Sequence, residues 1–204
     1  MRAERLGLLG GTFDPPHVGH AIVAQDVVEA LELDRLLVVP AGDPPHRSAV
    51  FAAALRLAWT RRVFEGDGRI EVLDDELRRA GPSYTVDTLA LIRRERQPSE
   101  LYCVMGADQL RTIDTWHEYR RLPELARIAV MRRVGEAAEP PVPADRIAYI
   151  TIDVMRIDLS STRVRERLRA GRSIRYLVPE RIRAQVEQAW NERAPEGARA
   201  SRGC

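Results

Sequence analysis

Two histidines near the start of the chain stand at a spacing that suits phosphate chemistry. Residues 8–20 read Leu-Leu-Gly-Gly-Thr-Phe-Asp-Pro-Pro-His-Val-Gly-His, so His17 and His20 share one face of the first turn of a helix. A strand that ends at Gly10 and Gly11 lets backbone amides approach a ligand, and the helix start adds free N–H groups and partial positive charge. The pattern predicts an anion site in which both imidazoles hydrogen-bond phosphate oxygens.

Other interpretations of the histidine pair stay open on the residues alone. Such a pair can hold a metal ion, although no third or fourth ligand stands nearby, and it can also simply pack a turn. The glycines fit neither GxGxxG nor the lysine-containing P-loop. Because all 32 basic side chains are Arg and the chain contains no Lys, Schiff-base and lysine-nucleophile chemistry are excluded.

A second candidate anion site lies towards the other end of the chain, where residues 157–165 read Ile-Asp-Leu-Ser-Ser-Thr-Arg-Val-Arg. Ser160, Ser161 and Thr162 are residue types that cap helix N-termini and offer hydroxyl groups as well as amides. Arg165 can reach the same anion with a planar fork of donors. Taken alone, the pattern also fits a capped helix with a solvated, arginine-rich face.

Length and composition limit the class of protein. The 204 residues are 45% hydrophobic and carry a net charge of +2, which indicates a folded domain without the one-sided charge of a nucleic-acid or membrane-surface protein. The two cysteines, Cys103 and Cys204, cannot form a disulfide framework or a four-ligand zinc site. The first residues contain too few apolar side chains for a signal peptide, so we expect a cytoplasmic location.

Short apolar runs alternate with amphipathic stretches along the chain. The expected strands are 6–9, 35–39, 70–73, 101–105, 128–131 and 147–152. The expected helices are 19–31, 51–64, 86–96, 160–170 and 179–190. This alternation predicts an α/β fold with a doubly wound parallel sheet, in which ligands bind beyond the carboxyl ends of the strands. We expect one domain over 1–190, a surface connection at 135–145 and a disordered tail at 191–204.

The two candidate anion sites together resemble the nucleotidyltransferase superfamily. Residues 10–20 are similar to its opening signature, whose core is H-x-G-H, and Leu159 begins a segment similar to its closing I-S-S-T-x-x-R, with Leu in place of Ile. The related class I aminoacyl-tRNA synthetases fit poorly, because they are much longer and use a lysine-rich second signature. The resemblance implies a Rossmann-like fold with a helical C-terminal part, in which two helix N-termini clamp one triphosphate.

Three further segments make the resemblance closest to the bacterial nicotinate-nucleotide adenylyltransferase family. Residues 40–47 resemble its P-x-x-x-P-P-H-K loop, with Arg47 in place of Lys, and residues 81–89 resemble its S-Y-T-x-D-T-L segment. Residues 104–108, followed by Trp116, resemble its G-x-D…W region. The resemblance implies transfer of the adenylyl group of ATP to nicotinate mononucleotide, which gives deamido-NAD and pyrophosphate in NAD biosynthesis. Mg²⁺ would be held mainly by ATP phosphates, with no dedicated metal residues.

The resemblance also implies roles for single residues. The catalytic residues would be His17, His20 and Arg165. The ATP-binding residues would be Gly10, Gly11, Thr12, Phe13, His17, His20, Gly106, Asp108, Ser160, Ser161, Thr162 and Arg165. The residues that bind nicotinate mononucleotide would be Arg47, Tyr84, Thr85 and Trp116, with Trp116 stacked on the pyridine ring. Without the resemblance, Tyr84, Thr85 and Asp108 read equally well as helix caps, and Trp116 as a core residue.

Two alternative functions remain at this point. Pantetheine-phosphate adenylyltransferases share both phosphate signatures, but they are typically shorter and lack the S-Y-T-x-D-T-L segment. A regulatory nucleotide-binding protein could keep the fold without catalysis, although intact His17, His20 and Arg165 argue against it. The sequence leaves open whether the chain forms homo-oligomers, whether Arg47 contacts phosphate and how strongly nicotinate is preferred over nicotinamide mononucleotide.

Overall fold

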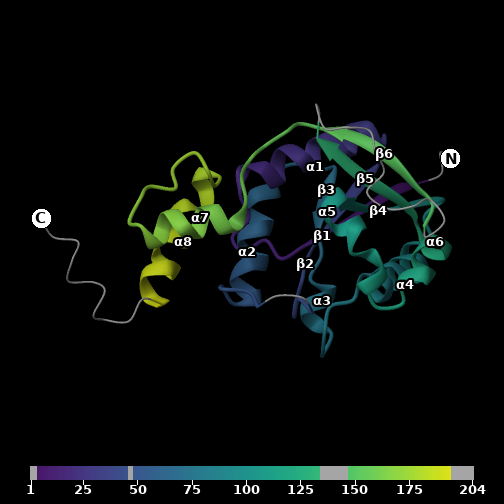
Figure 1. The fold of residues 1–204 in the computed structure, drawn as a ribbon, viewed down its shortest axis with the longest axis horizontal. Coiled ribbons are helices and arrows are strands. Elements are labelled where there is room, and N and C mark those ends of the chain that lie inside the picture. The colour runs from purple at the N-terminus through teal and green to yellow at the C-terminus, as the bar shows by residue number, and fades with distance from the viewer. Residues whose placement is uncertain (1–3, 46–47, 134–146, 194–204) are drawn as a thin grey trace, which may run out of the picture.

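A single parallel sheet organises the computed structural model, which describes residues 4–45, 48–133 and 147–193 (Figure 1). Its six strands lie in the order β3-β2-β1-β4-β5-β6, and every neighbouring pair is parallel. The strands are β1 (Arg5–Gly11), β2 (Arg35–Pro40), β3 (Ile70–Val72), β4 (Glu100–Gly106), β5 (Arg127–Arg133) and β6 (Tyr149–Val154). The predicted α/β fold with a doubly wound parallel sheet is confirmed, and each expected strand is present.

The five expected helices are also present. They are α1 (Val18–Ala30), α2 (Ala53–Phe64), α4 (Thr85–Arg96), α7 (Ser161–Arg169) and α8 (Glu180–Arg193). The structure adds short elements that were not predicted, namely α3 (Asp75–Arg78), α5 (Ala107–Arg111), η1 (Ile113–Thr115), η2 (Tyr119–Arg121) and α6 (Leu122–Leu125). These elements are too short to show a helical hydrophobic period. The connection at 135–145 and residues 194–204 of the expected tail lie outside the described residues. Residues 191–193, expected in the tail, instead form the end of α8.

Successive strand residues pack on opposite faces of the sheet, as the two-residue period of a strand requires. In β2, Leu37 and Val39 belong to the apolar cluster that α4, α5 and α6 cover, whereas Leu36 and Val38 belong to the cluster that α1 covers. All four of these side chains are buried. Burial on both faces explains why the strands read as continuous apolar runs rather than as alternating patterns.

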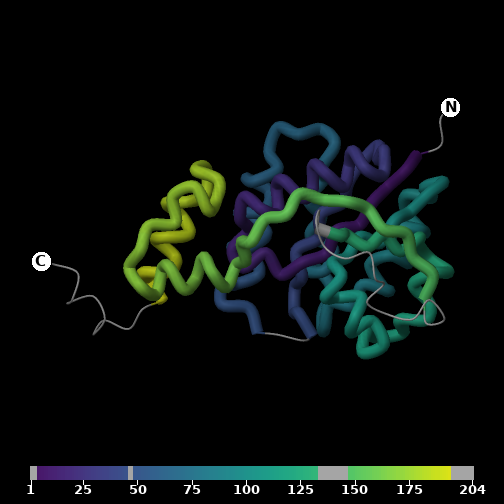
Figure 2. Tube along the Cα trace, turned by 45° about the horizontal axis from the view of Figure 1, so that its top comes forward, coloured from purple at the N-terminus to yellow at the C-terminus, as the bar shows by residue number. Residues whose placement is uncertain are grey.

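The last two helices lie to one side of the sheet. Figure 2 shows the chain running from β6 to α7 and α8, well away from the strands. A third apolar cluster holds them there, because Val164 and Ile182 pack with Trp59 of α2 and with Phe51 just before it. A cation–π contact also joins α8 to the segment before α2, because the Arg193 guanidinium lies 5.8 Å from the centre of the Phe51 ring. Helix α2 is therefore one link between the sheet and the C-terminal helices.

The described part of the chain contains no helix that is both long and apolar enough to cross a membrane.

Candidate active site

The strand order places the candidate site at the carboxyl ends of the two central strands. Strands β1 and β4 are neighbours, and the order of strands reverses between them. In open α/β sheets this reversal opens a crevice beyond the carboxyl ends of the strands, where ligands bind. Gly10 and Gly11 end β1, and Gly106 ends β4 and precedes α5, whose first turn contains the exposed Asp108. These predicted ATP-site residues therefore lie at the two sides of the crevice.

The histidine pair forms the start of α1. His17 is the N-cap residue, and its ring stacks on that of His20 with the ring centres 3.7 Å apart. The backbone N–H of His17 donates to Nδ1 of His20 at 3.0 Å. Because Nδ1 accepts this bond, the proton of the neutral His20 ring must be on Nε2. The local fold thus leaves Nε2–H of His20 as the free donor.

Burial keeps both imidazoles neutral. It lowers the pKa of His17 to about 4, and burial together with the neighbouring His17 holds the pKa of His20 well below its ordinary value. The Nδ1 atom of His17 is buried without a hydrogen-bond partner in the described structure. An unpaired buried nitrogen is costly, and an anion beside the rings would favour their protonated forms. The pair is suited to accept charge when phosphate arrives.

Close packing explains why Gly19 stands between the two histidines. A Cβ atom at this position would lie 3.0 Å from Nδ1 of His17 and 3.4 Å from a methyl carbon of Ile157. A side chain here would therefore require the His17 ring or Ile157 to shift slightly. The glycine of H-x-G-H serves close packing and not a special backbone angle.

The start of α7 lies directly against the start of α1. The Ser161 hydroxyl donates to the carbonyl of Pro15 at 2.8 Å, and Ser160 caps α7 by accepting from the N–H of Arg163 at 3.2 Å. Thr162 accepts from Nη2 of Arg165 at 3.1 Å, which leaves its own hydroxyl proton free. The structure therefore brings the two predicted anion sites together, although the proton of the Ser161 hydroxyl is already used within the protein.

Asp14 connects these helix starts to the loop before α2, a role that the sequence reading missed. Its buried carboxylate accepts the N–H groups of Val50 at 2.8 Å and of Phe51 at 2.9 Å. Arg165 donates from Nη1 to the same carboxylate at 3.3 Å and also to the Asp14 carbonyl. Asp14 lies within residues 8–20. Nothing in that segment indicates that its partner is Arg165, near the other end of the chain.

The predicted acceptor residues gather at the start of α4. Tyr84 is the N-cap residue, Thr85 begins the helix, and the Tyr84 ring stacks on His117 with ring centres 4.2 Å apart. Trp116, next to His117, is partly buried and packs against the same apolar cluster as Tyr84. The structure thus brings three of the four predicted acceptor residues together and adds His117, which sequence reasoning missed. Arg47, the fourth, lies outside the described residues.

A buried polar network fixes the acceptor segment to the loop that follows β2. The Ser83 hydroxyl oxygen accepts the N–H groups of Gly42 at 2.9 Å and of Asp43 at 3.2 Å. The Thr88 hydroxyl donates to Glu76 at 2.8 Å. Burial raises the pKa of Glu76 despite this hydrogen bond. These contacts hold 81–89 and 40–45 as one unit.

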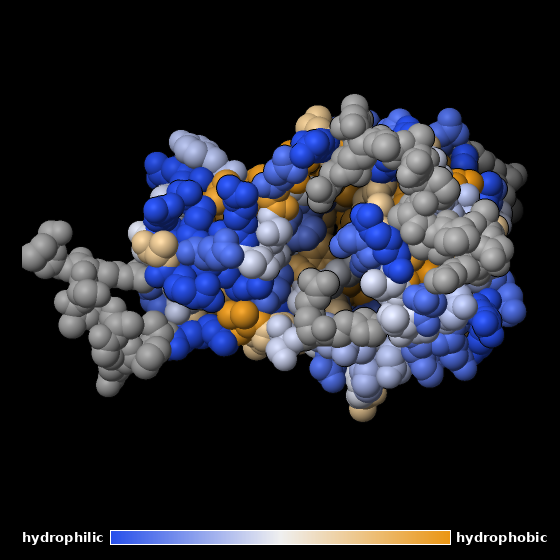
Figure 3. Space-filling model, in the orientation of Figure 1, coloured by the Kyte–Doolittle hydropathy of each residue, from blue (hydrophilic) through white to orange (hydrophobic). Residues whose placement is uncertain are grey.

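Between the C-terminal helices and the sheet, the molecular surface is hollowed. Figure 3 shows apolar residues at the bottom of this hollow and polar residues around it. An apolar depression with a few convergent polar groups is the usual form of a small-molecule site.

Comparisons with known proteins agree with this geometry. A family model described as cytidylyltransferase-like matches residues 8–167, which include both phosphate signatures and the acceptor segment. The chain is 42% identical over 184 residues to a probable nicotinate-nucleotide adenylyltransferase of Gemmatimonas aurantiaca, with 87% of each protein covered. It is also 42% identical to a Thermus thermophilus protein with the same description, with 90% of this chain and 97% of that protein covered.

The chain belongs to the nicotinate-nucleotide adenylyltransferase family.

A solved structure supports the same fold for this family member. The nicotinic acid mononucleotide adenylyltransferase of Plasmodium falciparum, solved in complex with NaAD, has a TM-score of 0.71 and 15% sequence identity to this chain. The alignment covers 93% of this chain and 95% of that one. The Rossmann-like nucleotidyltransferase fold inferred from the H-x-G-H and S-S-T segments is thereby confirmed. The resemblance to the family is confirmed by the relatives at 42% identity.

Proposed function

We propose that this chain transfers the adenylyl group of ATP to nicotinate mononucleotide and releases pyrophosphate, as a step of NAD biosynthesis. The observation that carries the proposal is the contact between the two helix starts. The start of α1, with His17 and His20, and the start of α7, with Thr162 and Arg165, contact each other through the Ser161 and Arg165 side chains. The names of the relatives point to the same reaction.

The proposed reaction is a direct displacement. A phosphate oxygen of nicotinate mononucleotide forms a bond to the α-phosphorus of ATP, while the bond from that phosphorus to the oxygen that bridges to the β-phosphate breaks. The electron pair of the broken bond leaves with pyrophosphate. Positioning and electrostatic stabilisation dominate reactions of this type, so no covalent enzyme intermediate is needed.

Each part of the site has a distinct task in this proposal. Nε2–H of His20 and the imidazole of His17 hydrogen-bond phosphate oxygens whose charge grows as the bond to the leaving group breaks. Arg165 presents the donors that Asp14 and Thr162 do not use. The residues Gly10, Gly11, Thr12, Phe13, Gly106, Asp108, Ser160 and Ser161 complete the ATP site.

Mg²⁺ is the metal ion that we propose for the reaction. In the described residues no group of three or more His, Cys, Asp or Glu side chains could hold a metal ion. Mg²⁺ commonly keeps several waters and binds through substrate phosphates, so a site made mainly of phosphate oxygens fits these residues. The ion would neutralise part of the triphosphate charge.

Acceptor recognition is assigned to the start of α4. Trp116 would stack on the pyridine ring, Tyr84 and Thr85 would surround the carboxylate, and Arg47 would be a further acceptor-binding residue. The experiment is to incubate the protein with ATP, Mg²⁺ and one acceptor at a time, and to follow pyrophosphate. Nicotinate mononucleotide should be the best acceptor, whereas turnover only with phosphopantetheine, or no turnover with any acceptor, would contradict the proposal.

A further inference from the structure

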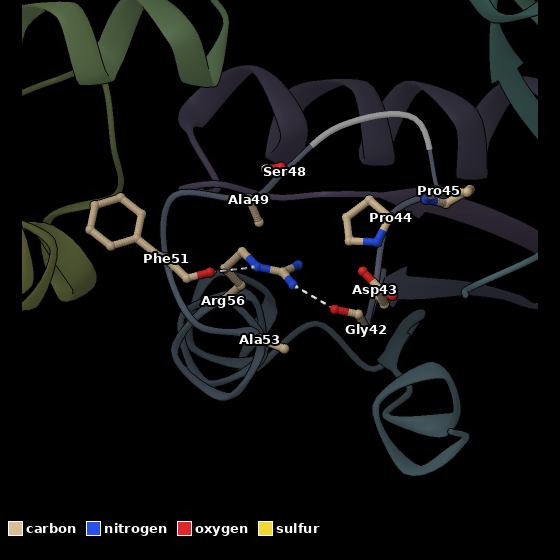
Figure 4. A pocket seen from close by; sticks show the side chains of 9 residues that line it. All are labelled: Gly42, Asp43, Pro44, Pro45, Ser48, Ala49, Phe51, Ala53 and Arg56. Carbon is tan, nitrogen blue, oxygen red and sulfur yellow. Dashed lines mark hydrogen bonds between the residues drawn. The ribbon is translucent and has the colours of Figure 1, made fainter. Parts of the chain in front are cut away.

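A buried arginine outside the predicted site connects three loops around it. Arg56 lies in the first turn of α2 and is only 1% exposed. Its guanidinium donates from Nε to the Phe51 carbonyl at 3.1 Å, from Nη1 to the Thr12 carbonyl at 2.7 Å and from Nη2 to the Gly42 carbonyl at 3.1 Å. Figure 4 shows the side chain lying between the loop that contains Gly42 and the segment before α2.

Stability alone gives a poor account of this side chain. Burying a charge is costly unless it is well paired, and a cation in the first turn of a helix opposes the helix dipole. Burial accordingly lowers the pKa of Arg56, while the Asp14 carboxylate acts in the opposite direction. The three hydrogen-bond acceptors of the guanidinium are neutral carbonyls. The three hydrogen bonds of Arg56 instead fix the positions of these carbonyls relative to one another.

The three carbonyls belong to parts of the site with different tasks. Thr12 lies in the loop between β1 and α1 that is assigned to ATP, and Gly42 lies in the loop after β2 that is attached to the acceptor segment through Ser83. In a trans peptide the N–H points away from the carbonyl. The Gly42 carbonyl faces Arg56 while the next N–H, of Asp43, faces Ser83 at 3.2 Å. The loop is held from both sides.

Gly42 is also enclosed by backbone. A Cβ atom at this position would lie 2.3 Å from the carbonyl oxygen of Glu76, a contact that no side chain can make. The loop after β2 is therefore fixed by the Glu76 backbone, by Ser83 and by Arg56. Arg56 alone among these three also contacts the ATP-side loop, at Thr12.

We propose that Arg56 is a positioning residue that keeps the ATP-phosphate loop and the acceptor loop at the separation needed for in-line attack. The proposal rests on the proposed function for its catalytic part only. A displacement of about 1 Å between reacting groups can reduce a rate by about 100-fold, so a residue that sets the distance between two loops affects kcat/KM without touching a substrate.

The test compares Arg56→Met with a matched control, Thr60→Val. Thr60 lies one turn further along α2, is fully buried, and donates its hydroxyl to the Arg56 carbonyl at 2.7 Å, so its loss weakens the same helix but leaves the loops untouched. Hydrogen exchange of the ligand-free protein should show that the amides of 42, 43, 50 and 51 exchange at least about 10-fold faster in Arg56→Met, and unchanged in Thr60→Val. Those four amides are bonded to Ser83 or Asp14.

Steady-state kinetics supplies the second measurement. We expect kcat/KM for nicotinate mononucleotide to fall about 100-fold in Arg56→Met and to stay within about 3-fold in Thr60→Val. Arg56→Lys keeps the charge but cannot reach three carbonyls, so it should resemble Arg56→Met; it replaces that variant if Arg56→Met does not fold. Equal effects of the Arg56 and Thr60 substitutions, or an unchanged kcat/KM, would overturn the proposal. An inactive unmodified protein would instead refute the proposed function, while the exchange data would still decide whether Arg56 holds the loops.

Discussion

Arg165 donates hydrogen bonds to both the carbonyl and the carboxylate of Asp14, which lies 151 positions earlier in the chain. The two side chains are mostly shielded from solvent, with accessible fractions of 19% for Arg165 and 5% for Asp14. Partly buried charge-assisted hydrogen bonds are stronger than exposed ones. The pair therefore attaches α7 to the start of α1, so that the proposed ATP site is complete only when the C-terminal helices are in place.

Removing the arginine should affect one substrate much more than the other. We expect Arg165→Ala to weaken ATP binding by about 10- to 100-fold, the range for losing one or two hydrogen bonds to a charged group. Binding of nicotinate mononucleotide should change little, because the proposed acceptor residues Tyr84 and Thr85 lie at the start of α4. Calorimetric titration of each substrate checks this, and an equal loss for both would mean that Arg165 acts through the fold.

Removing the charge of Asp14 should act mainly on stability. In Asp14→Asn one acceptor oxygen becomes an NH2 group that faces the N–H of Val50 or Phe51, and Arg165 loses its ion pair. A buried donor left facing a donor costs about 1–3 kcal/mol. Urea unfolding of Asp14→Asn beside the unmodified protein measures this, with Asp153→Asn as a control, since Asp153 pairs with Arg132 at an exposed position. If Asp14→Asn lowers the free energy of unfolding no more than Asp153→Asn does, Asp14 does not stabilise the contact between the helix starts and the loop before α2.

His20 should contribute to the chemical step. We expect His20→Ala to reduce turnover by about 100- to 1,000-fold, the scale for losing one transition-state donor, because Nε2–H is the free donor at the start of α1. The thermal midpoint is measured alongside, because His20→Ala also removes the acceptor of the His17 N–H and the stacked ring. Near-normal turnover in a folded variant would exclude the catalytic role of this residue.

Acid should destabilise the protein through the histidine pair. Burial lowers the pKa of His17 from an ordinary 6.5 to about 4, so the unfolded chain takes up the proton first as the pH falls. The stabilisation is therefore present above pH 6.5 and is lost as the pH falls from 6.5 to about 4, with a limit of about 3 kcal/mol for this shift. His20 changes in the same direction. Urea unfolding gives the free energy of unfolding at pH 7 and at pH 5. Its decrease between these pH values should be smaller for His17→Asn than for the unmodified protein, and an equal decrease in both would contradict the buried, neutral state of His17.

The order of elements and the two phosphate segments could be predicted because their signals are local. Apolar runs mark the strands, and Gly10-Gly11 followed by His17 and His20 marks a strand-to-helix turn in one short stretch. The contacts of Asp14, Arg56 and His117 could not be predicted in this way. Asp14 meets Arg165 from the far end of the chain, Arg56 reads as one more charged residue of an amphipathic helix, and His117 meets Tyr84 only because short elements between β4 and β5 bring it there.

Preference for nicotinate over nicotinamide mononucleotide should arise at the start of α4. The first backbone bond of this helix runs from the N–H of Thr88 to the Tyr84 carbonyl, so the N–H groups of 85–87 have no partner within the helix. Free amides and the positive end of the helix dipole favour a carboxylate. A carboxamide would bring N–H donors against donors, and sites of this kind reject the mismatched analogue strongly. We expect kcat/KM to be at least about 100-fold higher for the acid.

One substitution can test the amides separately from the ring surface. Thr85 is the first residue of α4, a position where proline fits a helix and removes one free N–H group together with the threonine hydroxyl. Tyr84 before it is already extended, with φ −98° and ψ 131°. Thr85→Pro should therefore lower the acid-to-amide ratio of kcat/KM while the helix stays folded. Trp116→Ala is the matched control, because both pyridine rings stack alike and both acceptors should weaken together. Equal kcat/KM for the two mononucleotides in the unmodified protein would refute recognition of the carboxylate, and an unchanged ratio in Thr85→Pro would place that recognition elsewhere.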